Sequence, residues 1–365
     1  MSRNLLSLSV VASLLGGTAL ADAPRVAADI APVHSLVARV MQGVSAPTLI
    51  VPPGASPHEY SLRPSQAAAL QEADLVFWVS PELTPWLDGA VETLAPNATV
   101  TELLEAEGAT RLPFREDALF EAHAHGDDAH SDAGHDEHGH DDHDHDHDGH
   151  DHDHDDHGHD DHGHDDHGHD DHDHGHDDHK DHDDHEDHGH EGHDHGEHDP
   201  HAWLSPDNGA VWLNVIAAQL SAADPDNAGA YFANAAAGRE ELTSLSAEIN
   251  AILDPVRGGN FIVFHDAYQY FEAAFDFPAS GAISVSDATD PSPARIAEIQ
   301  ARVADQGVTC VLSEPQFNAG IVAVVTDGAK VQSGVLDPLG STEEPGPDLY
   351  ANVLRKLATT LADCL

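Results

Sequence analysis

A tract of histidine, aspartate, glycine and glutamate fills residues 121–199, and it limits the fold more than any other feature of this 365-residue chain. Repeats such as HGHDDHGHDD contain no apolar residues at the period of a helix or a strand. Without apolar surface to bury, a segment cannot offset the entropy lost on ordering. We therefore expect the tract to be a disordered insertion in the absence of metal, tolerated because loop closure costs little more as a loop lengthens.

The chain is strongly acidic, with a formal net charge of −53. The tract holds 33 of the 67 acidic residues and only one base, Lys180. Nucleic acids and anionic membranes are excluded as partners, because binding phosphate requires clustered lysine and arginine. The charge suits cations instead.

The first 21 residues have the pattern of an export signal. Arg3 provides a basic start, Leu5 to Leu15 is a short apolar run, and Ala19-Leu20-Ala21 is a cleavage-type ending. We expect cleavage after about Ala21. No later stretch approaches about 20 continuous apolar residues, so we expect an exported, soluble protein with no membrane insertion.

Short apolar runs alternate with helical patterns on both sides of the tract. Helices are expected over residues 36–41 and from about Pro64, between the strands of the first half. Such alternation predicts parallel βαβ units and an α/β fold. The expected strands are residues 26–30, 47–51, 75–79, 261–264, 308–313 and 331–336.

A single long helix is expected between the two patterned halves. Pro225 stands at its start, a broken apolar stripe runs from Tyr231 to Leu253, and Pro255 ends it. The predicted organisation is two α/β lobes with parallel-rich sheets, joined by a rigid helix. The expected ranges are 22–224 for the first lobe with its insertion, 225–253 for the connecting helix and 254–365 for the second lobe. A ligand cleft between the lobes is expected.

The chain has two cysteines, Cys310 and Cys364. In an oxidising compartment, an even pair in an otherwise cysteine-free chain favours one disulfide. It would tie the C-terminus to the end of an expected strand. The alternative is two unrelated buried thiols.

Four histidines lie outside the tract and its border. His58 follows an expected strand, His201 precedes a helix start at Ser205-Pro206, and His265 ends a strongly apolar run. Each stands at the edge of an ordered element, where loops gather ligands. Alone, each is more often structural, but three neutral imidazoles in two lobes suit zinc. His34 is expected in the first turn of a helix, without a metal role.

A tetrahedral zinc site needs one more donor or a water molecule. Asp337, in SGVLDPLGS, follows another expected strand and could supply it. The alternative role of Asp337 is to cap the turn before Pro338.

Five motifs occur in the order GASPHEYSLRPSQ, DPHAWLSP, FHDAYQYF, SEPQF and LDPLG. Together they resemble the zinc-uptake (ZnuA-type) solute-binding proteins of metal-transporting ABC systems, in the cluster A-I family. The resemblance covers essentially the mature chain, and a His-rich insertion at this position is typical of the zinc members.

The resemblance implies a set of site residues. The matching histidines His58, His201 and His265 bind the metal in that family, and Asp337 matches an aspartate that is a ligand or a close neighbour. Manganese-selective relatives commonly have glutamate where this chain has His265. Some zinc members have an acidic residue before the first histidine, whereas this chain has Pro57, so Asp337, Glu59 or water could complete the coordination. The cysteines matching Cys310 and Cys364 form a disulfide.

The resemblance implies a periplasmic Zn²⁺-binding protein, expected to be monomeric, that delivers zinc to an inner-membrane ABC permease. We expect the tract to capture zinc near the cleft; the alternative is a dispensable solubilising insertion. No enzymatic activity is expected, and no GxxxxGK[ST] loop is present for ATP. Two other functions stay open. The first is a periplasmic zinc store, and the second is a zinc hydrolase, disfavoured because HExxH is missing and Glu59 is the only tempting base.

Overall fold

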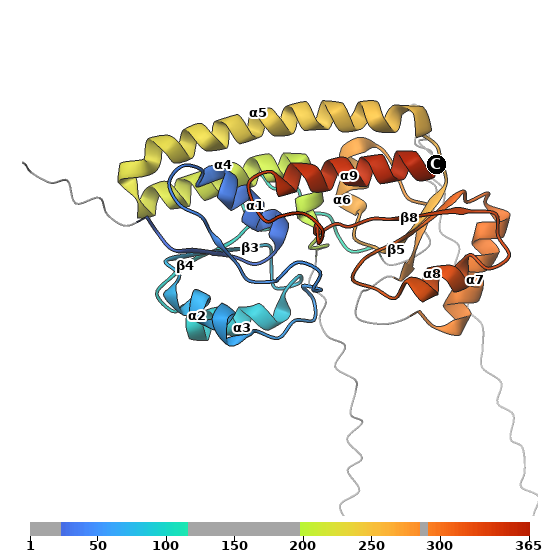
Figure 1. Cartoon of the computed structure of the whole chain (residues 1–365), viewed down its shortest axis with the longest axis horizontal. Coiled ribbons are helices and arrows are strands. Elements are labelled where there is room, and N and C mark those ends of the chain that lie inside the picture. Colours follow the sequence, from blue (N-terminus) through green and yellow to red (C-terminus); the bar gives the residue numbers. More distant parts are fainter. Residues whose placement is uncertain (1–22, 116–197, 285–290) are drawn as a thin grey trace, which may run out of the picture. The chain divides into compact units, whose positions relative to one another are not determined.

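Two four-stranded sheets, both entirely parallel, form the framework of the computed structural model (Figure 1). The structure describes residues 23–115, 198–284 and 291–365, which belong to one compact unit. The predicted export signal and the tract up to residue 197 lie outside the described residues.

The first sheet has the strand order β2-β1-β3-β4. Its strands are β1 (Val26–Ala28), β2 (Thr48–Leu49), β3 (Leu75–Trp78) and β4 (Thr99–Glu102). The connections contain helices α1 (Ala31–Val40), α2 (Pro64–Glu72) and α3 (Pro85–Leu94). All three have a proline in the first two positions, where the missing N–H costs no hydrogen bond.

The second sheet repeats this arrangement, with the order β6-β5-β7-β8. Its strands are β5 (Phe261–His265), β6 (Gly281–Ser284), β7 (Cys310–Ser313) and β8 (Gln332–Val335). Helices α6 (Gln269–Phe275), α7 (Pro293–Asp305) and α8 (Ala319–Val325) belong to this lobe. The predicted two-lobed α/β fold is confirmed.

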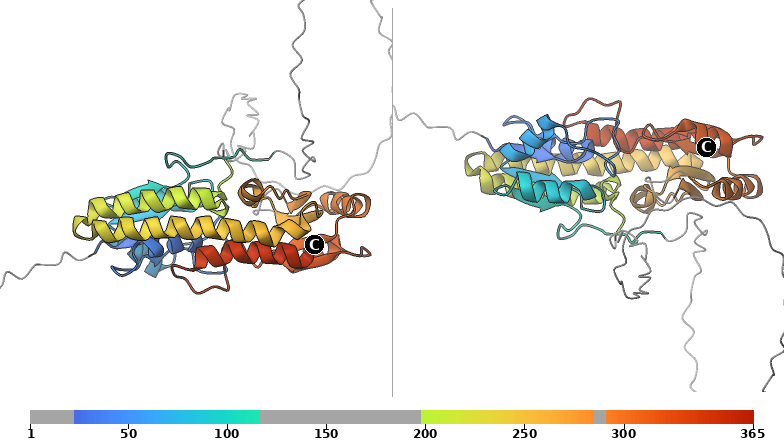
Figure 2. Two further views of the ribbon diagram at one scale, coloured as in Figure 1. Left: turned by 90° about the horizontal axis from the view of Figure 1, so that it is seen from above. Right: turned by 90° about the horizontal axis from the view of Figure 1, so that it is seen from below.

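Three longer helices, α4 (Pro206–Ala223), α5 (Ala228–Leu253) and α9 (Leu349–Cys364), complete the fold. Helix α5 packs on both α4 and α9, and it runs from the first lobe to the second (Figure 2). Its buried residues recur every three or four positions, as expected for one helical face. They are Tyr231, Ala235, Gly238, Leu242, Leu245, Ile249 and Leu253.

Short 3₁₀ turns stand at the ends of these helices. The turn Pro225–Asn227 precedes α5, and Asp254–Val256 follows it. The long helix predicted from Pro225 therefore begins as a 3₁₀ turn. A third turn, Ala202–Leu204, leads into α4.

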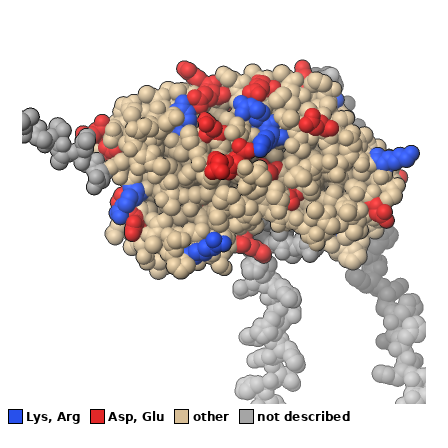
Figure 3. Space-filling model, in the orientation of Figure 1, with Lys and Arg blue, Asp and Glu red and all other residues tan. Residues whose placement is uncertain are grey.

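Ion pairs join α5 to the helices beside it. Arg39 of α1 lies 2.7 Å from Glu241, and Arg355 of α9 lies 2.8 Å from Glu248. Figure 3 shows acidic and basic side chains gathered over this part of the surface. Because these pairs are partly exposed, each contributes at most about 1 kcal/mol to stability.

A disulfide joins Cys310 of β7 to Cys364 at the end of α9, and this confirms the predicted pair. Both cysteines are buried. The bond fastens the last helix to the second sheet.

Candidate metal centre

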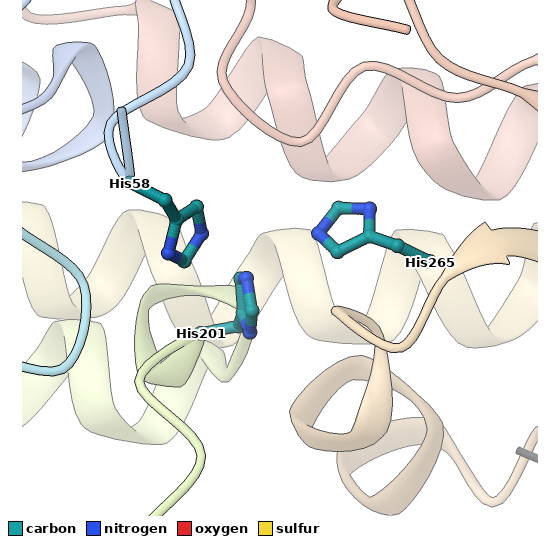
Figure 4. Close-up of side chains that lie close together, drawn as sticks. All are labelled: His58, His201 and His265. Atoms are coloured by element: carbon teal, nitrogen blue, oxygen red, sulfur yellow. The ribbon is translucent and has the colours of Figure 1, made fainter. Parts of the chain in front are cut away.

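The three loop histidines predicted from the sequence meet in the structure. One possible ligand nitrogen from each of His58, His201 and His265 lies within 4.8 Å of the others. The ring of His201 is central, with its centroid 5.4 Å from that of His58 and 5.3 Å from that of His265. Figure 4 shows the rings facing one another from three separate segments.

Each histidine is held by the element that carries it. His265 is the last residue of β5, at the carboxyl edge of a parallel sheet, where ligand sites of α/β proteins form. His201 immediately precedes the 3₁₀ turn that leads into α4. His58 lies on the loop between β2 and α2, which is anchored where the Trp86 indole N–H donates to the Pro57 carbonyl at 2.6 Å.

A buried carboxylate orients the ring of His201. Asp199 Oδ1 lies 2.7 Å from His201 Nδ1 and also accepts from the backbone N–H of His201 at 2.9 Å. Both side chains are buried. A carboxylate on Nδ1 fixes the proton there and turns Nε2 toward the other rings, the arrangement found behind metal-bound histidines.

His265 has the same kind of support. Glu314, the first residue after β7, places Oε1 2.7 Å from His265 Nδ1 and accepts from its backbone N–H at 3.3 Å. The His265 ring also packs edge-on against Phe317, at 5.2 Å between centroids. His265 is therefore fixed in both tautomer and orientation.

These two carboxylates were not predicted from the sequence as site residues. Asp199 was counted as the last residue of the tract, and Glu314 was noted only within the motif SEPQF. The usable signals were an aspartate two residues before an ordered histidine and a glutamate directly after a buried strand.

Asp337 is not part of the three-histidine group. Its Oδ1 accepts from the backbone N–H of Gly340 at 2.9 Å, and its Oδ2 accepts from the backbone N–H and the hydroxyl of Ser341 at 2.6 and 2.7 Å. In the described structure, Asp337 thus caps the turn after Pro338. Its role as a metal ligand stays a prediction.

Two other side chains considered from the sequence lie apart from the group. Glu59 is exposed. His34 is buried in the first turn of α1, where its Nε2 lies 3.2 Å from the Pro47 carbonyl oxygen. Burial lowers the pKa of His34, which favours the neutral ring.

The three rings open onto a pocket with largely apolar walls. An ion held there would be screened from bulk water, which strengthens its attraction to nearby carboxylates. Burial raises the pKa of Asp199 to about 7. Besides the histidines, the pocket is lined by Ser56, Pro57, Trp203, Glu314, Gln316, Phe317, Pro338 and Leu339.

Two lobes joined by a long helix, with three clustered imidazoles of which two are held by buried carboxylates, define a metal-binding protein of the two-lobed solute-binding class. The family model described as "Zinc-uptake complex component A periplasmic", ZnuA, matches residues 26–364. The chain belongs to this family.

Known proteins resemble the chain over nearly its whole length. The high-affinity zinc uptake system protein ZnuA of Brucella abortus (strain 2308) is 43% identical over 360 residues, covering 99% of this chain and 97% of the relative. A crystal structure of ZnuA superposes with a TM-score of 0.65 at 21% identity, covering 94% of this chain and 99% of that one. The periplasmic zinc-binding protein TroA of Treponema pallidum gives 0.66 at 17% identity, covering 93% and 98%. At these identities the two solved structures show the fold alone.

No helix among the described residues is both long enough and apolar enough to span a membrane.

Proposed function

We propose that this chain binds Zn²⁺ at His58, His201 and His265 and delivers it to an ABC-type zinc importer. The observation that carries the proposal is the approach of three imidazole nitrogens from distant segments to within 4.8 Å. Membership of the zinc-uptake family supports it. As in that family, the chain would act in the periplasm after removal of residues 1–21.

The ligand set suits zinc. Imidazole is a borderline-soft donor, and Zn²⁺ accepts three such nitrogens with one further oxygen in a tetrahedral shell. We assign Nε2 as the ligand atom of His201 and of His265, because Asp199 and Glu314 occupy Nδ1 of these two rings. The fourth position falls to water, Asp337 or Glu59.

Charge also favours a divalent cation. Asp199 and Glu314 are 2% and 3% exposed, so both carboxylates are largely withdrawn from water. Two buried negative charges balance one Zn²⁺ when the three imidazoles are neutral. A monovalent ion would leave one charge uncompensated at considerable cost.

We further propose that the His/Asp-rich tract is an auxiliary zinc-capture segment. Its imidazoles stand two or three residues apart in the sequence, a spacing that offers many weak sites. Tethering these sites to the folded chain raises the local zinc concentration near the cleft.

Zinc titration of the full chain tests the function and separates it from the alternatives. A transport receptor has one tight site that His201→Ala abolishes and that survives loss of the tract. A zinc store would lose nearly all binding with the tract. A hydrolase would turn over ester or amide substrates, and a chain without any tight site at the three histidines would refute the proposal.

A further inference from the structure

Both segments that flank residues 116–197 are attached to α6, the helix that follows His265. The Tyr270 hydroxyl accepts from the backbone N–H of Leu112 at 2.9 Å and donates to the Asp199 carbonyl at 2.8 Å. Tyr270 is 1% exposed. One buried hydroxyl of the second lobe therefore holds the segment before the tract and the segment after it.

The two flanking segments also pair with each other. Pro113 and His198 form an antiparallel bridge, and the Asp199 N–H donates to the Leu112 carbonyl at 2.8 Å. Arg115 forms two ion pairs next to this bridge: its Nη2 lies 3.0 Å from Oε2 of Glu272 in α6, and its Nη1 lies 3.5 Å from Oδ1 of Asp266. Both carboxylate side chains are only 8% exposed, so this is a largely desolvated ion-pair cluster.

Asp199 links these contacts to the three-histidine group. Its Oδ1 orients His201, and its Oδ2 lies 3.1 Å from the Gln269 amide nitrogen when that amide is oriented to donate. The same orientation brings the Gln269 amide 3.1 Å from the Pro113 carbonyl. A side chain of the second lobe thus supports the carboxylate that aligns a histidine of the first.

We propose that α6 is a latch that positions His201 through Asp199, with Gln269 and Tyr270 as its positioning residues. Moving α6 away from these segments removes support from the Asp199 backbone and side chain together. His201 then loses its fixed orientation, and the metal leaves more readily. An importer could discharge the site by separating α6 from the flanking segments; this inference rests on the proposed zinc site.

The test compares two buried tyrosines in the full chain. Tyr270→Phe removes the latch hydroxyl and keeps the ring. Tyr231→Phe is the matched control, because Tyr231 of α5 is also fully buried and its hydroxyl donates to Asp224, directly after α4, at 2.8 Å. Each protein receives one equivalent of Zn²⁺, and transfer to excess chelator is followed. The slow phase of this transfer reports zinc leaving the tight site. Its rate should be about three- to tenfold higher in Tyr270→Phe and unchanged in the control.

A second pair uses half-buried glutamines. Gln269→Ala should also speed release, whereas Gln300→Ala should not, since the Gln300 amide donates to the Val324 carbonyl away from the site. Co²⁺ in place of Zn²⁺ gives a spectroscopic readout. Its visible absorption should shift in both latch variants and in neither control.

Equal release rates and equal spectra for the latch variants and their controls would overturn the latch while leaving the zinc site intact. His201→Ala identifies the relevant phase, because it should abolish slow release. If slow release persists in His201→Ala, the proposed function fails, and the latch fails with it.

Discussion

Glu314 Oε1 lies 2.7 Å from His265 Nδ1, and only 1% of the glutamate side chain and 7% of the histidine side chain are exposed. A carboxylate withdrawn so far from water interacts strongly with charge that arrives on the far side of the ring. The metal, the imidazole and the carboxylate are therefore expected to act as one unit.

Replacing Glu314 by glutamine should lower zinc affinity about 10- to 100-fold, because the amide removes the charge behind His265. Competition with a chelator of known affinity measures the change. Glu298→Gln is the control, since Glu298 pairs with Arg295 on the surface of α7 with 51% of its side chain exposed. Unchanged affinity in the Glu314 variant would show that the contact does not tune the metal.

His265→Glu should weaken the preference for zinc over manganese. The substitution replaces a borderline-soft nitrogen by a hard oxygen, and it places a second carboxylate beside Glu314. The ratio of the two affinities measures the preference and should fall at least about tenfold. His265→Gln separates loss of the imidazole from gain of a charge. The selectivity argument fails if the ratio stays the same.

Zinc should stabilise the protein more as the pH rises from 5 to 8. Burial raises the pKa of Asp199 to about 7 and that of Glu272 to about 6. A carboxyl with a raised pKa in the fold contributes fully to stability below about pH 4, and that contribution is lost as the pH rises through 6 to 7. Zinc opposes the loss, because its charge favours the ionised carboxylate and binding requires neutral imidazoles.

Thermal unfolding with and without zinc, at several pH values, checks this expectation. The difference in Tm between the zinc-bound and zinc-free protein should widen as the pH rises. Glu272→Gln should make the Tm of the zinc-free protein depend less steeply on pH. A Tm difference that is constant from pH 5 to 8 would contradict it.

Reducing the disulfide should destabilise the protein by about 4 kcal/mol, the loop-closure value for cysteines 54 residues apart. Denaturant unfolding with and without reductant measures the loss. A Cys310→Ser/Cys364→Ser chain is the control, because reductant should not affect it. Equal midpoints for the oxidised and reduced chains would mean that α9 is held by packing alone.

Deleting residues 123–197 should leave one tight zinc site and remove the weaker ones. The deletion keeps the pairing of Pro113 with His198 and the whole three-histidine group. Zinc stoichiometry and uptake under scarcity are the measurements. If both are the same in the shortened and full chains, the tract has no role in capture.

Much of the fold follows from periodicity. The runs at 75–79 and 261–264 became β3 and β5, since fully buried strands read as continuous apolar segments. Strand β4, with the sequence TVTE and no buried residue, carries no such signal. The helix expected from residue 36 begins at Ala31, because Pro32 is tolerated in a first turn.

The sequence predicted which three histidines meet, but it did not predict the carboxylates that orient two of them. His58, His201 and His265 stand out because they border ordered elements. Glu314 meets His265 only through the fold, because the two residues are 49 positions apart in the sequence. Asp199 lies two residues before His201, but it was counted with the tract. The ligand role of Asp337 and the limits of the two lobes remain predictions.

The pairing of Pro113 with His198 also has a practical consequence. Because the chain departs and returns at neighbouring points, the length of whatever lies between is free to vary without a change in the lobes. This position is therefore suited to the insertion of another domain. A fluorescent domain spliced between residues 123 and 197 should leave this pairing and zinc binding by the three histidines unchanged.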